Sequence, residues 1–258
     1  MSINEIILLL VSGVVVGIIN TLGGGGSVIT MSLFMAMGMP ISIANGTNRI
    51  AVLLQNLSAT MAFLRKGMLH LKSGLLLSIP AIVGNIFGAL VATEVSESIF
   101  KICLSVVLVI ILIYLILGKD RESVSGGHGL QIKWWHYLWF FIIGFYGGYV
   151  YIGLGFLILA IAVWSMDLDI VTANVVKGFV IFLSTPFALA VFIYNGQVEW
   201  IAGLLHGAGN ILGAIMASHW AMNWGVKFVR WFTLFIIVVF FIDLMGWISL
   251  QSMLSQLL

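Results

Sequence analysis

Charged residues are scarce in this sequence. Only 8% of its 258 residues are Asp, Glu, Lys or Arg, and 62% are hydrophobic. A water-soluble protein normally carries about 25% charged residues. The mean hydropathy of +1.18 and the repeated apolar runs, near the ~20 residues that cross a bilayer, indicate a polytopic membrane protein. This composition excludes a soluble enzyme and a secreted disulfide scaffold.

Cysteine and blocks of like charge are also nearly absent. Cys103 is the single cysteine, so the chain has no intrachain disulfide, thiolate metal cage or dithiol redox pair. The net charge of +2 comes from 11 basic and 9 acidic residues that are scattered along the chain, so we expect no nucleic-acid partner. The His, Cys, Asp and Glu residues nowhere show the spacing of a zinc or two-carboxylate site. We therefore expect no metal, no cofactor and no enzymatic activity.

Ten apolar segments fall into two sets of five, separated by a long polar stretch rich in Gly, Ser and charge. Their bounds are 6–22, 28–39, 50–64, 73–92 and 99–117, then 134–151, 155–166, 178–194, 201–222 and 226–250. The first segment lacks a basic flank and a convincing cleavage site, so we expect it to belong to the mature protein. We predict a first membrane repeat over 1–117, a cytoplasmic linker over 118–133 and a second membrane repeat over 134–258.

An internal repeat becomes visible when the sequence is shifted by 129 residues against itself. Gly24 then falls on Gly153, Asn45 on Asn174 and Gly67 on Gly196, with no gap between these positions. Glycine is common in membrane helices, but the shared asparagine and the shared turn glycine together favour a duplication.

The distribution of basic residues predicts the orientation of the two halves, because short loops rich in Lys and Arg favour the cytoplasmic side. Such residues lie after the third segment and in the linker: Arg65, Lys66, Lys72, Lys119, Arg121 and Lys133. The equivalent loop of the second half, 195–200, has neither Lys nor Arg, whereas Lys227 and Arg230 follow the next segment. We therefore predict two inverted repeats with both termini outside. Secondary transporters commonly have this architecture, with substrate near the midplane.

A glycine run follows the first apolar segment and consists of Gly23, Gly24, Gly25, Gly26 and Ser27. The next apolar piece is too short to cross a ~30 Å core at ~1.5 Å per residue, so we predict a broken or re-entrant pair of helices. Irregular backbone at that depth must face protein or a water-filled cavity, and glycine N–H groups can converge there on an anion. Gly153 and Gly155 would form the equivalent element. The alternative is that these glycines only allow close helix packing.

The third segment of each half carries a polar face. In the first half this face comprises Asn45, Asn48, Arg49, Val52 and Asn56, with Gln55 beside it. At the 129-residue offset, Asn45, Asn48, Gln55 and Asn56 correspond to Asn174, Lys177, Ser184 and Thr185. Amides and cations are costly in lipid, so we expect this face to point into the protein and its cations to bind substrate. For Arg49 and Lys177, the alternative is snorkelling to the membrane surface.

Three further polar residues are candidates for proton coupling. His206 and Asn210 share one face of the ninth segment with Gly213, and Asp243 lies in the tenth. Either the histidine or the aspartate could move a proton. The alternative is that His206 and Asn210 form a satisfied interior pair and that Asp243 is solvated near a helix end.

Several motifs together resemble the TauE/SafE family of sulfite exporters, also called the TSUP transporters. They are INTLGGGGS, ANGTNR, GFYGGYVYIGLGF, TANVVK and the NGQV turn. The resemblance covers nearly the whole chain. It implies a membrane transporter of sulfur-containing anions such as sulfite, sulfoacetate or organosulfonates. Members have fewer membrane spans than the ten segments found here, which agrees only if some glycine-flanked pieces are half-helices.

These observations together predict an all-α polytopic protein of the inner cell membrane that transports a small sulfur-containing oxyanion. The expected substrate ligands are the Lys177 ammonium, the amides of Asn45, Asn48 and Asn174, and the backbone of 23–27, with Arg49 as the second cation. An anion channel and a non-transporting membrane scaffold are the alternatives. The identity of the anion, the direction of transport and the existence of a homodimer stay open.

Overall fold

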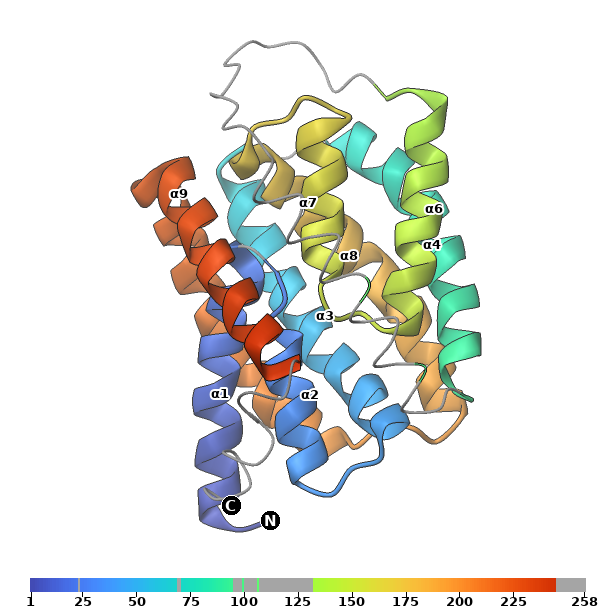
Figure 1. Cartoon of the computed structure of the whole chain (residues 1–258), viewed down its shortest axis with the longest axis vertical. Coiled ribbons are helices and arrows are strands. Elements are labelled where there is room, and N and C mark those ends of the chain that lie inside the picture. Colours follow the sequence, from blue (N-terminus) through green and yellow to red (C-terminus); the bar gives the residue numbers. More distant parts are fainter. Residues whose placement is uncertain (23, 69–70, 95–98, 100–105, 107–131, 245–258) are drawn as a thin grey trace.

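The computed structural model describes residues 1–22, 24–68, 71–94, 99, 106 and 132–244 (Figure 1). The described chain is all helical, with α1 (Ile3–Leu22), α2 (Ser27–Ala36), α3 (Ile41–Arg65), α4 (Leu71–Ala92), α6 (Trp134–Tyr149), α7 (Leu154–Trp164), α8 (Ile170–Tyr194) and α9 (Trp200–Leu244). The predicted segment 99–117 and most of the linker lie outside the described residues. Beyond Trp220 the course of α9 is described, but few of its side chains are.

Two helices begin earlier than their apolar runs, so the predicted starts at residues 50 and 178 were wrong. Helix α3 begins directly after Pro40, and α8 begins after Asp169, whose carboxylate accepts hydrogen bonds from the Val171 and Thr172 N–H groups. The turns that follow, 45–49 in α3 and 174–177 in α8, carry polar residues that are buried in protein, which hydropathy cannot detect. The predicted segment 201–222 and residues 226–244 of the next one lie on one continuous helix.

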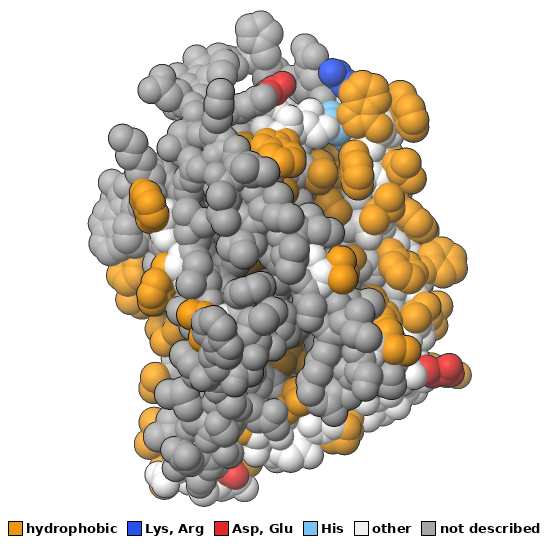
Figure 2. Space-filling view, viewed as in Figure 1, with side chains coloured by type: hydrophobic (Ala, Val, Ile, Leu, Met, Phe, Trp, Pro, Cys, Tyr) orange, Lys and Arg blue, Asp and Glu red, His pale blue; other side chains and the backbone are white. Residues whose placement is uncertain are grey.

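Four of the described helices are long and apolar enough to cross a membrane: Ile3–Leu22, Leu71–Ala92, Val171–Tyr194 and Trp200–Trp220. Large hydrophobic side chains are exposed along α4 and α6, among them Ile79, Phe87, Leu138 and Ile142. Figure 2 shows this apolar face, with its charged side chains toward the two ends. A surface of this kind is solvated by lipid, so the chain is a multi-pass membrane protein.

Helices α2 and α7 are only 10 and 11 residues long. At ~1.5 Å per residue each covers about half of a ~30 Å hydrocarbon core. Each also follows a break in the chain after a longer helix. The two pairs, α1–α2 and α6–α7, therefore form the discontinuous elements that the glycine pattern predicts.

The 129-residue offset recurs in the backbone. It carries Ile41–Arg65 of α3 onto Ile170–Tyr194 of α8. It also relates positions with positive φ, because Gly24, Gly38 and Gly67 correspond to Gly153, Asp167 and Gly196. The two halves of the described chain thus repeat the same order of helices and breaks.

The two halves interlock rather than lie side by side. Helix α1 packs against α9, α4 packs against α6, and α3 crosses α8. The first helix of each half therefore packs on the fourth helix of the other half. Figure 1 shows that the equivalent helices α1 and α6 run in opposite directions.

Small residues allow the close approach of these paired helices. A Cβ atom on Gly13 would overlap the His206 carbonyl of α9, and one on Gly84 would overlap the Phe141 carbonyl of α6. Glycines four residues apart occur in both pairs, as in the helix-packing motifs of other membrane proteins. Close helix packing therefore explains the glycines of these four helices, which lie outside the glycine run.

Candidate functional site

The two chain breaks lie close together. The first break comprises residues 24–26 before α2, and the second comprises residues 150–153 before α7. Gly24 and Gly25 have φ angles of +129° and +89°, and Gly153 has a φ angle of +77°. Residues other than glycine rarely adopt φ angles in this region. A Cβ atom on Gly24 would lie 3.0 Å from the Gly155 Cα atom. The missing side chain at Gly24 is therefore what lets the first break approach the start of α7.

A small buried cavity lies where the breaks meet. It leaves about 10 Å³ for the centre of a water molecule, which is room for about one water. The cavity is lined by both breaks and by the crossing helices, through Asn20, Gly24, Gly25, Ser27, Gln55, Asn56, Tyr151, Gly153, Leu154, Gly155 and Ile181. Each half of the chain therefore contributes to one shared cavity.

Both half-helices point their N-termini at this cavity. Helix α2 begins at Ser27 and α7 at Leu154, and both residues are part of the cavity lining. The first N–H groups of a helix have no acceptor within it, and the helix dipole places partial positive charge there. Two helix N-termini that converge on one cavity favour an anionic occupant.

Amide and hydroxyl groups complete the lining of the cavity. The Asn20 side chain donates to Gln55 Oε1 over 3.2 Å, and the Asn56 side chain donates to the Val52 carbonyl over 2.9 Å. The Ser27 side chain is only 1% exposed, and its hydroxyl has no hydrogen-bond partner in the described part of the chain. A buried hydroxyl without a partner is costly, so Ser27 is an available donor for a bound group.

Lys177 lies beside the cavity and binds the C-terminal end of α1. Its Nζ atom donates to the carbonyl oxygens of Asn20 (2.9 Å) and Thr21 (3.2 Å) and to Asn174 Oδ1 (2.6 Å). The Asn174 amide in turn donates to the Leu22 carbonyl over 3.2 Å. An ammonium group at this place neutralises the negative end of the α1 dipole.

Arg49 binds the C-terminal end of α6 in the same way as Lys177 binds that of α1. Its guanidinium donates to the carbonyl oxygens of Gly147 and Gly148, the latter over 2.8 Å, and to Asn45 Oδ1 over 3.1 Å. The Asn45 amide donates to the Tyr149 carbonyl over 3.0 Å. The third helix of each half therefore caps the first helix of the other half with a cation and an asparagine.

Neither cation snorkels to the membrane surface, because the side chains of Arg49 and Lys177 are only 0% and 2% exposed.

The capping arrangement changes the charge balance of the two breaks. Each break brings together the negative end of one helix and the positive end of the next. Because the cations offset the negative ends of α1 and α6, the positive ends of α2 and α7 dominate the potential in the cavity.

The predicted substrate ligands thus divide into two groups. Gly24, Gly25, Ser27, Gly153 and Gly155 line the cavity, whereas Asn45, Arg49, Asn174 and Lys177 cap helix ends. Gly26 packs against Asn20, since a Cβ atom there would lie 3.0 Å from Asn20 Oδ1. Asn48 is buried with an Nδ2 atom that has no partner among the described residues. Gly23 lies outside the described residues.

Two residues of the lining, Asn20 and Tyr151, do not stand out from the sequence pattern as ligands. Asn20 carries an amide inside an apolar helix, three residues before the glycine run, a costly placement that could have identified it. Tyr151 has φ +65°, and no feature of the sequence indicates this conformation. Of the other polar-face residues, Ser184 and Thr185 donate to the Ile181 carbonyl of their own helix.

His206 lies outside the cavity and joins three helices. Its Nδ1 atom is 3.1 Å from the Leu9 carbonyl oxygen of α1, and its Nε2 atom is 2.9 Å from the Thr30 hydroxyl of α2. The carbonyl can only accept, so in the neutral imidazole Nδ1 carries the proton and Nε2 accepts from Thr30. The Asn210 side chain donates to the His206 carbonyl over 3.0 Å. A role of these two residues in proton coupling stays a prediction, and the Asp243 side chain lies outside the described residues.

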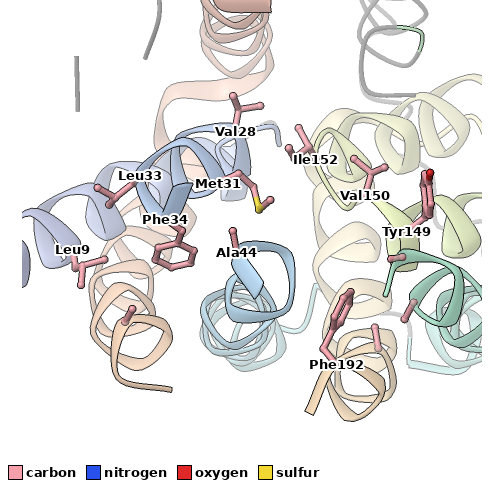
Figure 3. Close-up of a cluster of buried hydrophobic side chains, with 14 of the residues drawn as sticks. Leu9, Val28, Met31, Leu33, Phe34, Ala44, Tyr149, Val150, Ile152 and Phe192 are labelled. Carbon is pink, nitrogen blue, oxygen red and sulfur yellow. The ribbon is translucent and has the colours of Figure 1, made fainter. Parts of the chain in front are cut away.

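An apolar cluster supports the breaks on the side of α2. It includes Val28 and Met31 of α2, Val150 and Ile152 of the second break, and Phe192 of α8. Figure 3 shows Val28 beside Ile152, and Met31 pointing toward Ala44 of α3. Because residues of both halves share this cluster, the first break is anchored to the second by apolar packing as well as by backbone contact.

Comparisons with known proteins point to membrane transporters. The sequence model of a family described as sulfite exporter TauE/SafE matches residues 9–244. The chain is 31% identical to the "Probable membrane transporter protein ORF9" of a Sinorhizobium species over 86% of this chain and 85% of that protein. It is 27% identical to a "Probable membrane transporter protein" of Haemophilus influenzae over 89% and 90% of the two chains. Identity to YfcA of Escherichia coli, which carries the same description, is 25% over 83% and 80%. No solved structure matches the chain.

Proposed function

The chain belongs to the sulfite exporter TauE/SafE family, and on that premise we propose that it is a secondary transporter of a small sulfur-containing oxyanion. Its relatives are named as membrane transporters. The proposed substrate is of the sulfite or organosulfonate type.

The observation that carries this proposal is the convergence of two half-helix N-termini on one buried polar cavity. Helices α2 and α7 begin at this cavity, while Lys177 and Arg49 offset the opposite charge at the ends of α1 and α6. Discontinuous helices of this kind bind anionic groups in secondary transporters. The arrangement favours an anion over a cation.

The substrate's oxygen atoms accept hydrogen bonds from the backbone N–H groups around Gly25–Ser27 and Gly153–Gly155, and from the Ser27 hydroxyl. Asn20 and Gln55 add side-chain amides from α1 and α3. Lys177 and Arg49 act from behind the helix ends, so they attract the anion without direct contact. A sulfite ion is larger than a water molecule, so the cavity of about 10 Å³ belongs to a closed conformation that must widen to admit substrate.

The two halves lie in the membrane as inverted repeats, with both termini outside and the linker in the cytoplasm. The interlocked pairing of the first and fourth helices and the opposite directions of α1 and α6 in Figure 1 support this arrangement. If the helix pair α1–α2 rocks against the pair α6–α7, the cavity would open to each side of the membrane in turn. The closed cavity speaks against a permanently open anion channel.

A binding screen of the purified protein tests the proposal. Sulfite, thiosulfate, sulfate, organosulfonates and carboxylates are each added to the detergent-solubilised protein, and thermal stability and heat of binding are measured. We expect at least one sulfur oxyanion to bind and to be carried into liposomes. If no member of the panel binds or is carried, the proposed function is wrong.

A variant of the glycine run locates the binding in the cavity. Gly25→Val places a branched side chain where φ is +89°, so it should abolish oxyanion binding and flux because the backbone cannot keep this conformation. The control is Gly67→Asn, at a loop position with φ +67° that has no described neighbour within 4 Å. Asparagine tolerates this region, so the control should bind and transport normally. Normal flux in Gly25→Val would place the site elsewhere.

A further inference from the structure

His206 is a titratable side chain inside the membrane-spanning part of α9, and the proposed oxyanion cavity does not use it. It lies within the span Trp200–Trp220 and is 0% exposed. Its ring nitrogens contact α1 and α2, not its own helix. Ionisable residues in membrane segments are costly and commonly mark ion or proton sites.

The repeat shows that a half-helix can be held without a histidine. At the 129-residue offset Leu77 takes the place of His206. Leu77 shares an apolar cluster with Leu154 and Ile158 of α7, so apolar contact is enough to hold the second half-helix. Fixing α2 in place therefore does not by itself explain a titratable ring at residue 206.

The groups around the ring can hydrogen-bond to it in both protonation states. In the neutral ring, Nδ1 donates to the Leu9 carbonyl over 3.1 Å, and Nε2 accepts from the Thr30 hydroxyl over 2.9 Å. When a proton binds the lone pair of Nε2, the ring becomes an imidazolium with two N–H donors. Thr30 Oγ1 then accepts, because a hydroxyl can turn about its C–O bond without movement of a heavier atom.

The helices packed around the ring carry few charges, and none of those described pairs with it. Helix α2 has no charged residue, and Glu5 of α1 accepts a hydrogen bond at the start of that helix. On α3, Arg49 caps α6 and Arg65 is exposed at the helix end. On α9, His219 lies at the far end of the span. A proton on His206 is therefore an uncompensated positive charge, which a nearby anion stabilises.

Thr30 connects the ring to the end of α2 that points at the cavity. Helix α2 begins at Ser27 of the cavity lining. The Thr30 N–H lies 3.4 Å from the Gly26 carbonyl of the first break, and a threonine hydroxyl in a helix can donate to this same acceptor four residues earlier. When Nε2 carries a proton, the Thr30 hydroxyl no longer donates to the ring and is free to donate there. Protonation thus changes both charge and hydrogen bonding at the N-terminal end of α2.

We infer that His206 is a proton-binding site coupled to the oxyanion cavity. It takes up a proton at Nε2 when the anion binds, and its charge acts on the anion through Thr30 and the first turn of α2. The proton and the anion then raise each other's affinity by the same factor. This inference rests on the proposed function, since it assigns a coupled ion to the same substrate site.

The test counts the protons that the full-length protein takes up in detergent when it binds sulfite or, in parallel, thiosulfate. The heat of binding is measured in two buffers of different ionisation enthalpy, for the wild type and for His206→Gln. Glutamine can donate to the Leu9 carbonyl and accept from Thr30, as the neutral imidazole does, but it does not bind a proton. Protons carried by sulfite itself contribute equally to both proteins and cancel in the difference.

We expect the wild type to take up more protons than His206→Gln, by up to about one for each bound anion. Its Kd should therefore rise, relative to that of the variant, by up to about tenfold for each unit of increasing pH. Thr30→Val removes the acceptor of the Nε2 proton and should lower the uptake, whereas Thr30→Ser keeps the hydroxyl and should preserve it.

The matched control is His136→Gln. His136 is also buried, but its ring joins α6 to Ser165 and does not line the cavity, so this variant should take up protons like the wild type. A loss in His136→Gln as large as that in His206→Gln would overturn the inference, because the effect would not be specific to one ring.

Equal proton uptake by the wild type and His206→Gln also overturns it. So does equal uptake by Thr30→Val and Thr30→Ser, a comparison that decides the matter if His206→Gln does not fold. A wild type that binds none of the oxyanions in the screen contradicts the proposed function instead, so the two failures are distinguishable.

Discussion

The half-helices α2 and α7 hold equivalent places in the two halves, but different chemistry fixes each of them. Helix α2 is tied by the hydrogen bond between Thr30 and His206. At the 129-residue offset Leu77 takes the place of His206, and it shares an apolar cluster with Leu154 and Ile158 of α7. Hydrogen bonds are directional, whereas apolar contacts are not. The repeat is therefore conserved in the backbone of the two halves while their side chains have diverged.

The same divergence holds for the two capping cations. Arg49 reaches two carbonyl groups and one asparagine with a planar fork, whereas Lys177 reaches the same kind of acceptors as a compact charge. A guanidinium and an ammonium group are not interchangeable in geometry. Both nevertheless place one positive charge at the end of a broken helix, so the electrostatic function is shared although the chemistry differs.

The strongest test of the comparison is the orientation of equivalent loops. Lys66 and Asn195 correspond at the 129-residue offset and both are exposed. In a Cys103→Ala background, Lys66→Cys should be labelled by an impermeant thiol reagent only from the cytoplasm, and Asn195→Cys only from outside. The contrast should be all-or-none in intact cells. Labelling of both positions from the same side would end the inverted-repeat proposal.

The next largest effect concerns the two cations. Lys177→Gln and Arg49→Gln keep a hydrogen-bond donor but remove the charge that offsets the negative helix end. Because the charge acts through the helix end and not by contact, each should weaken sulfite binding by about 2 kcal/mol, or roughly 30-fold in Kd. Lys177→Arg should retain most of the affinity.

The exposed residue Lys72 provides the control for this experiment, as Lys72→Gln. Similar losses at the two cations would mean that the two halves contribute equally to the potential in the cavity. A loss at one of them alone would show that the halves are functionally unequal. If both losses are as small as that of the control, the cations do not shape the site.

The smallest effect is expected when the hydrogen bond between His206 and Thr30 of α2 is removed. His206→Leu introduces the side chain that the first half has at Leu77, and it leaves the Thr30 hydroxyl without its partner. We expect the free energy of unfolding in detergent to fall by about 1–3 kcal/mol. Leu77→Met, which conserves volume, should cost less than about 1.5 kcal/mol. A His206→Leu protein as stable as the wild type would mean that apolar packing alone can hold α2.

Much of the architecture could be predicted from the sequence, because membrane helices and duplications leave simple patterns. The offset that aligns Asn45 with Asn174 also aligns α3 with α8. Hydropathy missed the N-terminal parts of these helices, because it cannot distinguish polar residues that are buried in protein, such as Arg49 and Lys177, from polar residues in water. The breaks were predictable because glycine and short apolar pieces coincide at residues 23–27.

The roles of the polar residues were harder to predict. Helical spacing shows that Asn45 and Arg49 share a face, but it does not identify their partners. Those partners are backbone carbonyls about a hundred residues away, such as that of Gly147, which is 98 residues from Arg49. Every residue has a backbone carbonyl, so the sequence does not show which carbonyl groups accept these hydrogen bonds. The predicted substrate ligands therefore include residues that cap helix ends, and they do not include Asn20, which lines the cavity.

The capping of the first helix of each half by the third helix of the other half also has a consequence for biosynthesis. The first half enters the membrane before its partners are made, since the carbonyl that receives Arg49 lies 98 residues later and the ammonium that caps α1 lies 157 residues after Asn20. Until then an uncompensated guanidinium and an open helix end lie within the bilayer, which is costly. We therefore expect either half, when it is synthesised alone, to be less stable than the whole chain.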